Sequence, residues 1–226
     1  MIIDVLQPTT IEFLKELRAN NTKEWFEEHK KQFKNEETHT KAFFSSVLNL
    51  LRAHDDIDAM KMFRIYRDVR FSKNKQPYKN HLAVSYHRRK PHLRGGYYLH
   101  IEPGNSFIAC GFWDPKPDDL LRIRKEFEMD DVYIRKILND PDFVSTFGNL
   151  QGEEVKTAPK GFDKNHPAID LIKKKQFYAQ HSFTDEEVLS VSFLSTVDEA
   201  YKKIRPYFDY MSEVLTTDLN GVSLID

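Results

Sequence analysis

The first fifty residues repeat apolar positions every three or four residues, a period that is typical of amphipathic helices. Thr9 and Glu12 have the spacing of a capping box at the start of a first helix, which we expect to end near Asn20. Asn21 and Glu24 repeat that spacing before a second helix. The apolar positions are Ile11, Phe13, Leu14 and Leu17 in the first helix, Trp25, Phe26, His29 and Phe33 in the second, and Phe43, Phe44, Val47, Leu48 and Leu51 in a third helix after the polar stretch 34–41.

The period changes to two in the middle of the chain, as expected for β-strands. Residues 62–66 and 81–87 alternate in this way, and the segment 67–80 between them is polar and irregular. Residues 97–102 and 106–112 are rich in aromatic and β-branched side chains and are joined by Pro103-Gly104-Asn105, which predicts a hairpin. A further strand is expected at 176–183.

Helical periods return in the second half of the chain. Residues 118–127 and 130–138 predict two helices, and Asp140-Pro141 supplies a cap and a first-turn residue for a third. Residues 156–167 predict a loop, residues 169–174 a short helix, and residues from Asp185 onward a last helical region that Pro206 should kink or split. We therefore expect an α+β fold, with a helical N-terminus and C-terminus packed around a central, mostly antiparallel β-sheet, in one domain that spans residues 1–226.

Charge is unevenly distributed along the 226 residues. The whole chain has a formal charge of −1 and a pI near 6.8, yet residues 61–94 hold eleven basic residues and one acid, so this stretch carries +10 and the rest −11. The 40% of hydrophobic residues exclude a disordered chain, and no apolar run has the roughly 18 residues that a membrane span needs. No membrane partner is expected.

Cysteine usage and the N-terminal residues bear on the cellular compartment. Cys110 is the single cysteine, so no intramolecular disulfide can form. The N-terminal sequence MIIDVLQPTT lacks the basic and long apolar regions of a secretory signal. Both features predict a cytoplasmic protein.

Residues 63–79 interleave basic and aromatic side chains and are the most unusual part of the sequence. Guanidinium forks fit carboxylate or phosphate groups, and lysine adds a movable charge, so the segment predicts a pocket for a small anionic ligand. An equally weighted alternative is a structural ion-pair network with Asp68 and acids of the flanking helices. The predicted ligand-binding residues are Arg64, Arg67, Arg70, Lys73, Lys75, Tyr78, Lys79, Tyr98 and Lys160.

The same segment resembles a known protein family, the domain of unknown function numbered 2461. The likeness rests on Phe63-Arg64, residues 67–73 and residues 75–79, and it extends over roughly residues 10–215. The family usually has an aspartate where this chain has Asn74, so no carboxylate role is expected there. The resemblance implies a single-domain cytoplasmic α+β protein and brings no established activity. Further matching residues are Asn20, Asn21, Trp25, Phe26, Tyr97, Tyr98, Leu99, Pro103, Gly104, Gly111, Phe112, Trp113, Pro115, Lys156, Pro159, Gly161, Phe162, His166 and Pro167.

Acid–base and metal chemistry have a few candidate residues. His100 and His166 are the candidate catalytic residues, because histidine titrates near neutral pH. His100 and Glu102 share one face of the predicted strand, and Asp163 and His166 are able to join them as metal ligands. No paired zinc-binding motif supports this arrangement, so no metal site is predicted.

Two other classes of function compete with the small-anion pocket. A nucleic-acid-binding module would use the +10 stretch, including residues 87–94, which we expect to be a solvated loop. The pI near 6.8 is low for such a module. A structural or protein-interaction domain would satisfy every arginine internally. The sequence indicates neither an enzymatic reaction, nor a cofactor, nor an oligomeric state.

Overall fold

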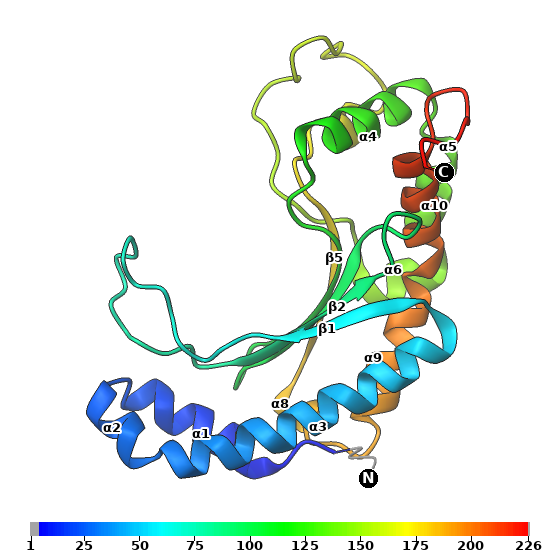
Figure 1. The fold of residues 1–226 in the computed structure, drawn as a ribbon. Coiled ribbons are helices and arrows are strands. Elements are labelled where there is room, and N and C mark those ends of the chain that lie inside the picture. Colours follow the sequence, from blue (N-terminus) through cyan, green and yellow to red (C-terminus); the bar gives the residue numbers. More distant parts are fainter. Residues whose placement is uncertain (1–4, 226) are drawn as a thin grey trace. The chain divides into compact units, whose positions relative to one another are not determined.

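The computed structural model of the chain describes residues 5–225. Residues 1–4 are outside this range. They are part of the N-terminal sequence that is expected to lack a secretory signal. The described part contains ten helices and a five-stranded antiparallel sheet, with helices at both ends (Figure 1), so the predicted α+β class is confirmed. The strands are β1 (Ile57–Met62), β2 (Leu82–Arg88), β3 (Gly96–Ile101), β4 (Ser106–Phe112) and β5 (Phe177–Phe183). They lie in the sheet in the order in which they occur in the chain.

The chain divides into two compact units, neither of which is continuous in sequence. Unit 1 comprises the residues up to Tyr86, Tyr98–Ile108 and Ser182–Glu199. Unit 2 comprises His87–Tyr97, Ala109–His181 and the residues from Ala200 onward. The single-domain organisation expected from the sequence stays a prediction.

Three helices begin unit 1: α1 (Pro8–Ala19), α2 (Lys23–Glu28) and α3 (Lys30–His54). The predicted capping box at Thr9 is wrong, because the helix already begins at Pro8, whose fixed φ suits a first helical turn. Thr9 and Thr10 instead donate their hydroxyl hydrogens to the carboxylate of Glu36 in α3, at 3.2 and 2.7 Å. These bonds join α1 to α3.

The break between the second and third helices lies at His29, whereas the sequence predicted it in the polar stretch 34–41. The ring of His29 stacks on Trp25 with 4.0 Å between centroids, and its Nδ1 bonds the Trp25 carbonyl at 2.8 Å. The polar stretch remains helical because most of it lies on the exposed side of α3, where Lys34 pairs with Glu37 at 2.6 Å.

The strand predicted at 62–66 is wrong, because the first strand, β1, lies earlier in the chain and ends at Met62. The Phe63 amide still bonds the Ala83 carbonyl of β2. Two further bonds join the residues before β2 to those after Met62, from the Arg67 amide to the Pro77 carbonyl and from the Lys79 amide to the Ile65 carbonyl. The segment between these bonds forms the long irregular loop that the sequence predicted, drawn in cyan in Figure 1.

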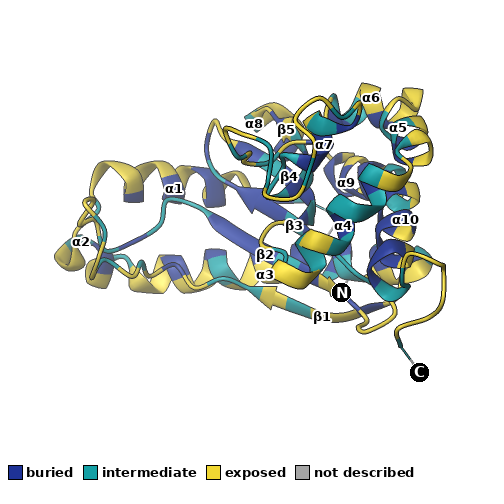
Figure 2. Cartoon of the chain, turned by 90° about the horizontal axis from the view of Figure 1, so that it is seen from above, coloured by how far each residue is buried: buried dark blue, intermediate teal, exposed yellow. Residues whose placement is uncertain are grey.

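A hydrophobic cluster fills unit 1 between the helices and the start of β2. Figure 2 shows that β2 and β3 are mostly buried while α2 is mostly exposed. Residues with no more than 3% of their surface exposed make up the cluster. They are Phe13, Leu14, Leu17, Phe26, Phe33, Ile65, Tyr78 and Leu82.

Unit 2 contains most of the helices of the second half: α4 (Pro117–Met129), α5 (Val132–Leu138), α6 (Pro141–Phe147), α7 (Ile169–Ile172) and α10 (Arg205–Thr216). The helix α8 (Asp185–Val188) lies in unit 1, and α9 (Phe193–Lys203) passes from unit 1 into unit 2. The predicted interruption near Pro206 is confirmed, since α9 ends at Lys203 and Pro206 lies in the first turn of α10. Asp140 caps α6 as predicted, accepting a bond from the Asp142 amide.

The expectation that residues 87–94 form a solvated loop is wrong for two of its arginines. Arg88 is the last residue of β2 and is 1% exposed, and its guanidinium pairs with Asp209 at 3.0 Å. Arg94 is partly buried and pairs with Asp119 at 2.5 Å. Arg89 and Lys90 are exposed as expected.

Within residues 5–225, no helix combines the length and the apolar character that crossing a membrane requires.

Candidate functional site

The candidate site lies in unit 1, on the face of β3 that carries Tyr98 and His100. Side chains alternate between the faces of a strand, so Leu99 and Ile101 point to the opposite face, where both are fully buried. On that buried side, the hydroxyl of Tyr86 in β2 donates to the carbonyl of Phe44 in α3 at 3.0 Å. The α3 side of the sheet is therefore the core side, and the polar residues of β3 lie on the other face.

A chain of hydrogen bonds runs along this polar face. His100 Nδ1 bonds the Tyr98 hydroxyl at 2.9 Å, and His100 Nε2 bonds Glu102 Oε2 at 3.0 Å. The His100 ring stacks on Phe107 of β4, with 4.6 Å between centroids. Both ring nitrogens and one face of the imidazole are thus held in place.

Glu102 is fixed by donors from three other segments. Its Oε1 accepts bonds from Arg18 of α1 at 3.1 Å and from Asn80 at 3.2 Å. Its Oε2 accepts a bond from Asn105 in the hairpin loop at 2.9 Å. The carboxylate is therefore oriented before any ligand arrives, which favours a role in binding or proton transfer.

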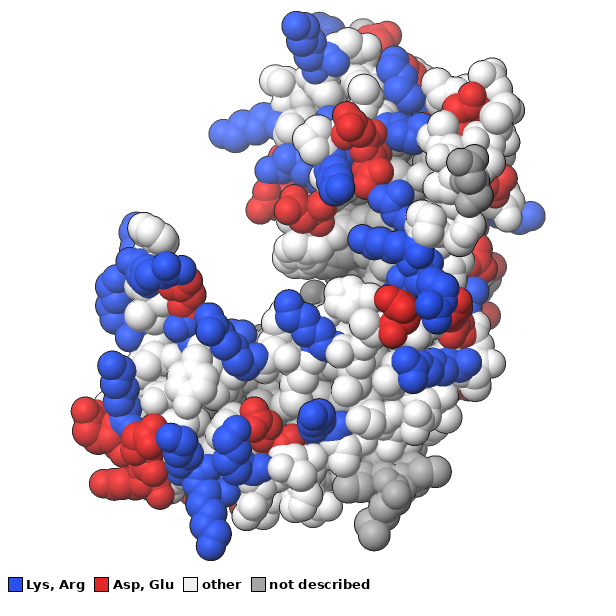
Figure 3. Space-filling model, viewed as in Figure 1, with Lys and Arg blue, Asp and Glu red and all other residues white. Residues whose placement is uncertain are grey.

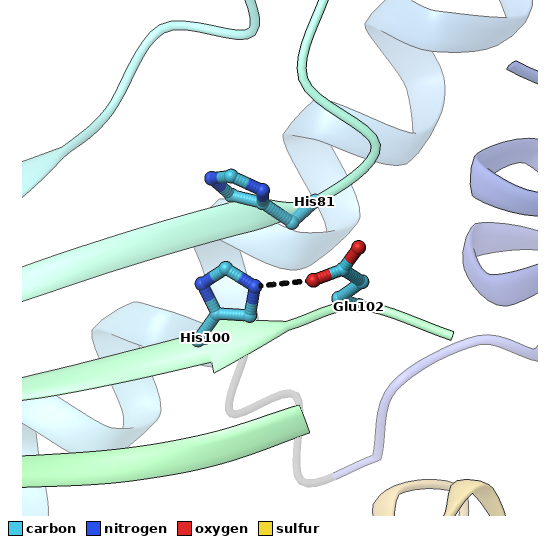
Figure 4. A group of neighbouring side chains, drawn as sticks. All are labelled: His81, His100 and Glu102. Atoms are coloured by element: carbon cyan, nitrogen blue, oxygen red, sulfur yellow. Dashed lines mark hydrogen bonds and ion pairs between the residues drawn. The ribbon is translucent and has the colours of Figure 1, made fainter. Parts of the chain in front are cut away.

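His81 completes the group, as Figure 4 shows. It lies directly before β2, and its ring centroid is 4.1 Å from that of His100. One ligand atom each of His81, His100 and Glu102 lies within 4.8 Å of the others, and within residues 5–225 this is the group of at least three such residues able to hold a metal ion. Two imidazoles and a carboxylate are a ligand set that suits divalent transition metals.

His100 and Glu102 were predicted from the sequence, and His81 was not. The alternation in residues 81–87 placed His81 on the polar face of its strand, which is the one signal that was available. Its closeness to His100 depends on which residues of β2 and β3 lie side by side, and a single sequence does not give that register.

Burial and neighbouring charges shift the proton affinities of this group. Burial lowers the pKa of His81 to about 4, with a further contribution from His100. Burial also lowers the pKa of His100 against the opposing effect of Glu102, and it raises the pKa of Tyr98 to about 12. Burial acts to raise the pKa of Glu102, but the bonds from Asn105 and His100 outweigh it and lower that pKa. Both histidines are therefore neutral at pH 7, and each has one ring nitrogen with a lone pair that can accept a proton or a metal ion. In His100 both ring nitrogens form hydrogen bonds, to Tyr98 and to Glu102.

Three of the predicted cations lie beside this group. Lys79 is half-buried, and its ammonium lies 5.5 Å from the centre of the Phe63 ring, which in turn meets Tyr98 edge-on at 5.9 Å. Burial lowers the pKa of Lys79, and the charges of Arg64 and Arg67 lower it further. Among residues 5–225, no carboxylate forms an ion pair with any of these three cations.

The other cations of the motif lie farther along the loop between β1 and β2. Arg70 donates to Asp68 at 2.7 and 3.0 Å, and Lys75 donates to the Val69 carbonyl at 3.0 Å. Lys73 is exposed. Figure 3 shows Lys and Arg side chains gathered over this loop. Arg70 and Lys75 therefore have partners within the loop, and among the described residues no hydrogen bond or ion pair joins them to Lys79.

Tyr78, which was expected to close the pocket, lies in the core of unit 1. It is 3% exposed, and its ring stacks on Phe26 with 4.0 Å between centroids. Its amide and carbonyl are both bonded by the side chain of Asn21, at 3.1 Å each. Tyr78 thus ties the start of β2 to the segment between α1 and α2.

Lys160 and His166 belong to unit 2, and so does Asp163. Lys160 is exposed, and Asp163 accepts a bond from the Asn165 amide at 2.9 Å. His166 Nδ1 accepts a bond from the Ala168 amide at 3.1 Å, directly before α7. Neither Asp163 nor His166 belongs to the group formed by His100 and Glu102.

The fold and this group of residues define an α+β protein with a pre-oriented histidine–glutamate site beside a cluster of cations. A family model described as conserved hypothetical protein (DUF2461) matches residues 9–210. The chain belongs to this family, as its resemblance had indicated, and the function of the family is unknown. A comparison with curated proteins finds no match.

Proposed function

We propose that unit 1 binds a small ligand bearing a phosphate or carboxylate group through Arg64, Arg67 and Lys79. The observation that carries this proposal is that Arg64 and Arg67 act as like charges on Lys79, while none of the three forms an ion pair with a carboxylate among the described residues. Like charges held together destabilise the fold, and Asp68, which acts on Arg64, is itself bonded to Arg70, so a bound anion would lower that cost.

The surroundings of Lys79 favour a small organic anion. The Phe63 and Tyr98 rings offer an apolar surface next to the ammonium, and apolar walls strengthen the attraction between an anion and a cation. His100 lies beyond Tyr98, bonded to it and to Glu102. If the bound ligand reacts, His100 is the residue we assign to proton transfer, with Glu102 orienting it.

The experiment is calorimetric titration with inorganic phosphate, pyrophosphate and citrate as probes. Arg67→Ala and Lys79→Ala should each lower the affinity for the tightest-binding probe at least tenfold, which is about 1.4 kcal/mol of binding free energy. Lys41→Ala is the matched control, because Lys41 is an exposed cation of the same unit, in α3, and its loss should leave affinity unchanged.

Two results would count against the proposal. One is that Arg67→Ala and Lys79→Ala bind the probe with an affinity within twofold of that of the unmodified protein. The other is loss of the cooperative thermal transition in Arg67→Ala, since that arginine would then be structural.

A second candidate function, nucleic-acid binding, rests on the tip of the loop between β1 and β2. Phe71 is 97% exposed there, next to Arg70 and two residues before Lys73. Exposed aromatic rings among cations stack on unpaired bases while the cations contact phosphates. Binding of a single-stranded oligonucleotide should weaken as salt rises, and Phe71→Ala should weaken it at constant salt. An affinity that does not change with salt would exclude this function.

We also propose a cytoplasmic location. It rests on the single cysteine, Cys110, which is free and buried.

A further inference from the structure

We infer that His81, His100 and Glu102 bind a divalent transition-metal ion, with Zn²⁺ as the ion that tests it. This inference does not depend on anion binding at Lys79. It rests on the donor atoms of the three side chains, their spacing and the residues that hold them.

The donor atoms are close to coordination geometry. His100 Nε2 and Glu102 Oε2 are 3.0 Å apart, and all three ligand atoms lie within 4.8 Å of one another. Zinc bonds to nitrogen and to carboxylate oxygen are each about 2.0–2.2 Å long, so neighbouring ligands around one ion are about 3–4 Å apart. Binding one ion would require the three donor atoms to move closer, and the half-buried His81 is the ligand with room to do so.

The two residues of β3 have outer partners of the kind that metal ligands have. With a metal on Nε2, the His100 ring carries its proton on Nδ1 and donates it to the Tyr98 hydroxyl oxygen, which lies 2.9 Å away. Arg18 and Asn80 bond Oε1 of Glu102, and Asn105 donates to Oε2, the oxygen that would bind the ion. These contacts fix the direction of both ligands in advance.

Three protein ligands leave the remaining coordination positions of the ion open. Structural zinc sites are closed by four protein ligands, whereas sites that bind or activate a substrate keep a position for water or ligand. Lys79 acts electrostatically on both His81 and His100, so an anionic group is the ligand that this surrounding favours at the open position.

The test measures Zn²⁺ binding directly. Protein stripped of metal with a chelator and then dialysed would be titrated with Zn²⁺ by calorimetry, and bound metal would be counted by elemental analysis. Co²⁺ in place of Zn²⁺ gives a visible absorption spectrum that reports its ligands. One ion per chain is expected, and His81→Ala and Glu102→Gln should each weaken its binding at least a hundredfold.

His39→Ala is the matched control, because His39 is an exposed histidine of unit 1, in α3. It should bind Zn²⁺ as the unmodified protein does. Lys79→Ala separates this inference from the proposed anion site: it should lose phosphate affinity and keep or strengthen Zn²⁺ binding.

Circular dichroism and thermal unfolding would establish that each variant is folded. His81→Ala alters a half-buried residue and Glu102→Gln preserves the shape of the side chain, so at least one folded variant is expected. Absence of Zn²⁺ binding below millimolar concentration overturns the inference. Binding that His81→Ala and Glu102→Gln leave unchanged also overturns it, and the three residues would then form a structural hydrogen-bonded group only.

Discussion

Arg88 carries its charge in the interior of unit 2, where each end of its guanidinium has a partner. Its Nη1 donates to the carbonyls of Arg94 and Phe208 and to the Ser212 hydroxyl, at 3.0–3.3 Å. Its Nη2 pairs with Asp209 at 3.0 Å. The guanidinium also lies over the Phe208 ring, 5.0 Å from its centre. Arg88 therefore links the end of β2 to α10.

Replacing Arg88 with methionine should strongly destabilise the protein. The change fills most of the space but removes the donor that bonds the Arg94 carbonyl, the Ser212 hydroxyl and the Asp209 carboxylate, so we expect a loss of about 3–5 kcal/mol in the free energy of unfolding. Urea denaturation measures it. Lys90→Met, at an exposed position two residues later, should change the stability by less than about 0.5 kcal/mol. Equal effects of the two substitutions would show that Arg88 is not a structural residue.

Cys110 is a thiol that the fold protects. It is 1% exposed in β4, and burial raises the pKa of its thiol well above the ordinary value. Because the thiolate is the reactive form, a thiol reagent at pH 8 should modify the native protein at least about a hundredfold more slowly than the protein unfolded in guanidinium. Comparable rates in the two states would contradict the buried position of Cys110.

At the scale of elements, the Asn21 side chain bonds the backbone of Tyr78 as a neighbouring strand would. Its amide group donates to the Tyr78 carbonyl and accepts from the Tyr78 amide, so it closes a pair of bonds of the kind found in a sheet. The loop between β1 and β2 begins and ends at the two bonds between residues 65–67 and 77–79. Asn21 fastens the base of this loop to the end of α1.

Asn21→Ala should loosen the base of the loop while the rest of unit 1 stays folded. Tyr78 then loses both partners, and its amide should exchange with deuterium at least about tenfold faster, with a global loss of about 1–2 kcal/mol. Asn20→Ala, which removes a bond to the Glu16 carbonyl at the end of α1, should leave the exchange of Tyr78 unchanged. Exchange that is equally slow in all three proteins would exclude this role for Asn21.

Local sequence signals predicted the elements whose ends are determined locally. The turn of the hairpin of β3 and β4 is recognisable from its Pro-Gly-Asn sequence. Pro206 interrupts the helical region because proline has no amide hydrogen to donate. The break at His29 was not predicted, because it depends on the stacking of His29 on Trp25 rather than on the polar stretch that follows. Period-two alternation predicted that His100 and Glu102 share a face, whereas His81 joins them through the pairing of two strands.

The whole molecule distributes its basic stretch over both units. Arg64, Arg67 and Lys79 lie in unit 1 and form no ion pair with a carboxylate among residues 5–225. Arg88 and Arg94 lie in unit 2, each paired with an acid. The proposed function concerns only the part of the basic stretch 61–94 that lies in unit 1.

The chain passes five times between the two units, and each passage lies inside a regular element. Four of the passages lie within β2, β3, β4 and β5, and the fifth lies within α9. Backbone hydrogen bonds of a strand or helix form and break cooperatively with their neighbours. Unfolding of one unit would therefore break elements that continue into the other, which favours a single cooperative transition.

Each unit contains one of the two tryptophans, so this prediction is open to direct measurement. Trp25 of unit 1 stacks on His29 at 4.0 Å, and Trp113 of unit 2 lies 4.4 Å from Tyr178. In guanidinium denaturation, the fluorescence of Trp113→Phe reports unit 1 and that of Trp25→Phe reports unit 2. We expect each fluorescence transition to coincide with the circular dichroism transition of the same variant, as two-state unfolding requires. Two separated transitions in either variant would show that the units unfold independently, because the backbone elements they share would then fail to couple them.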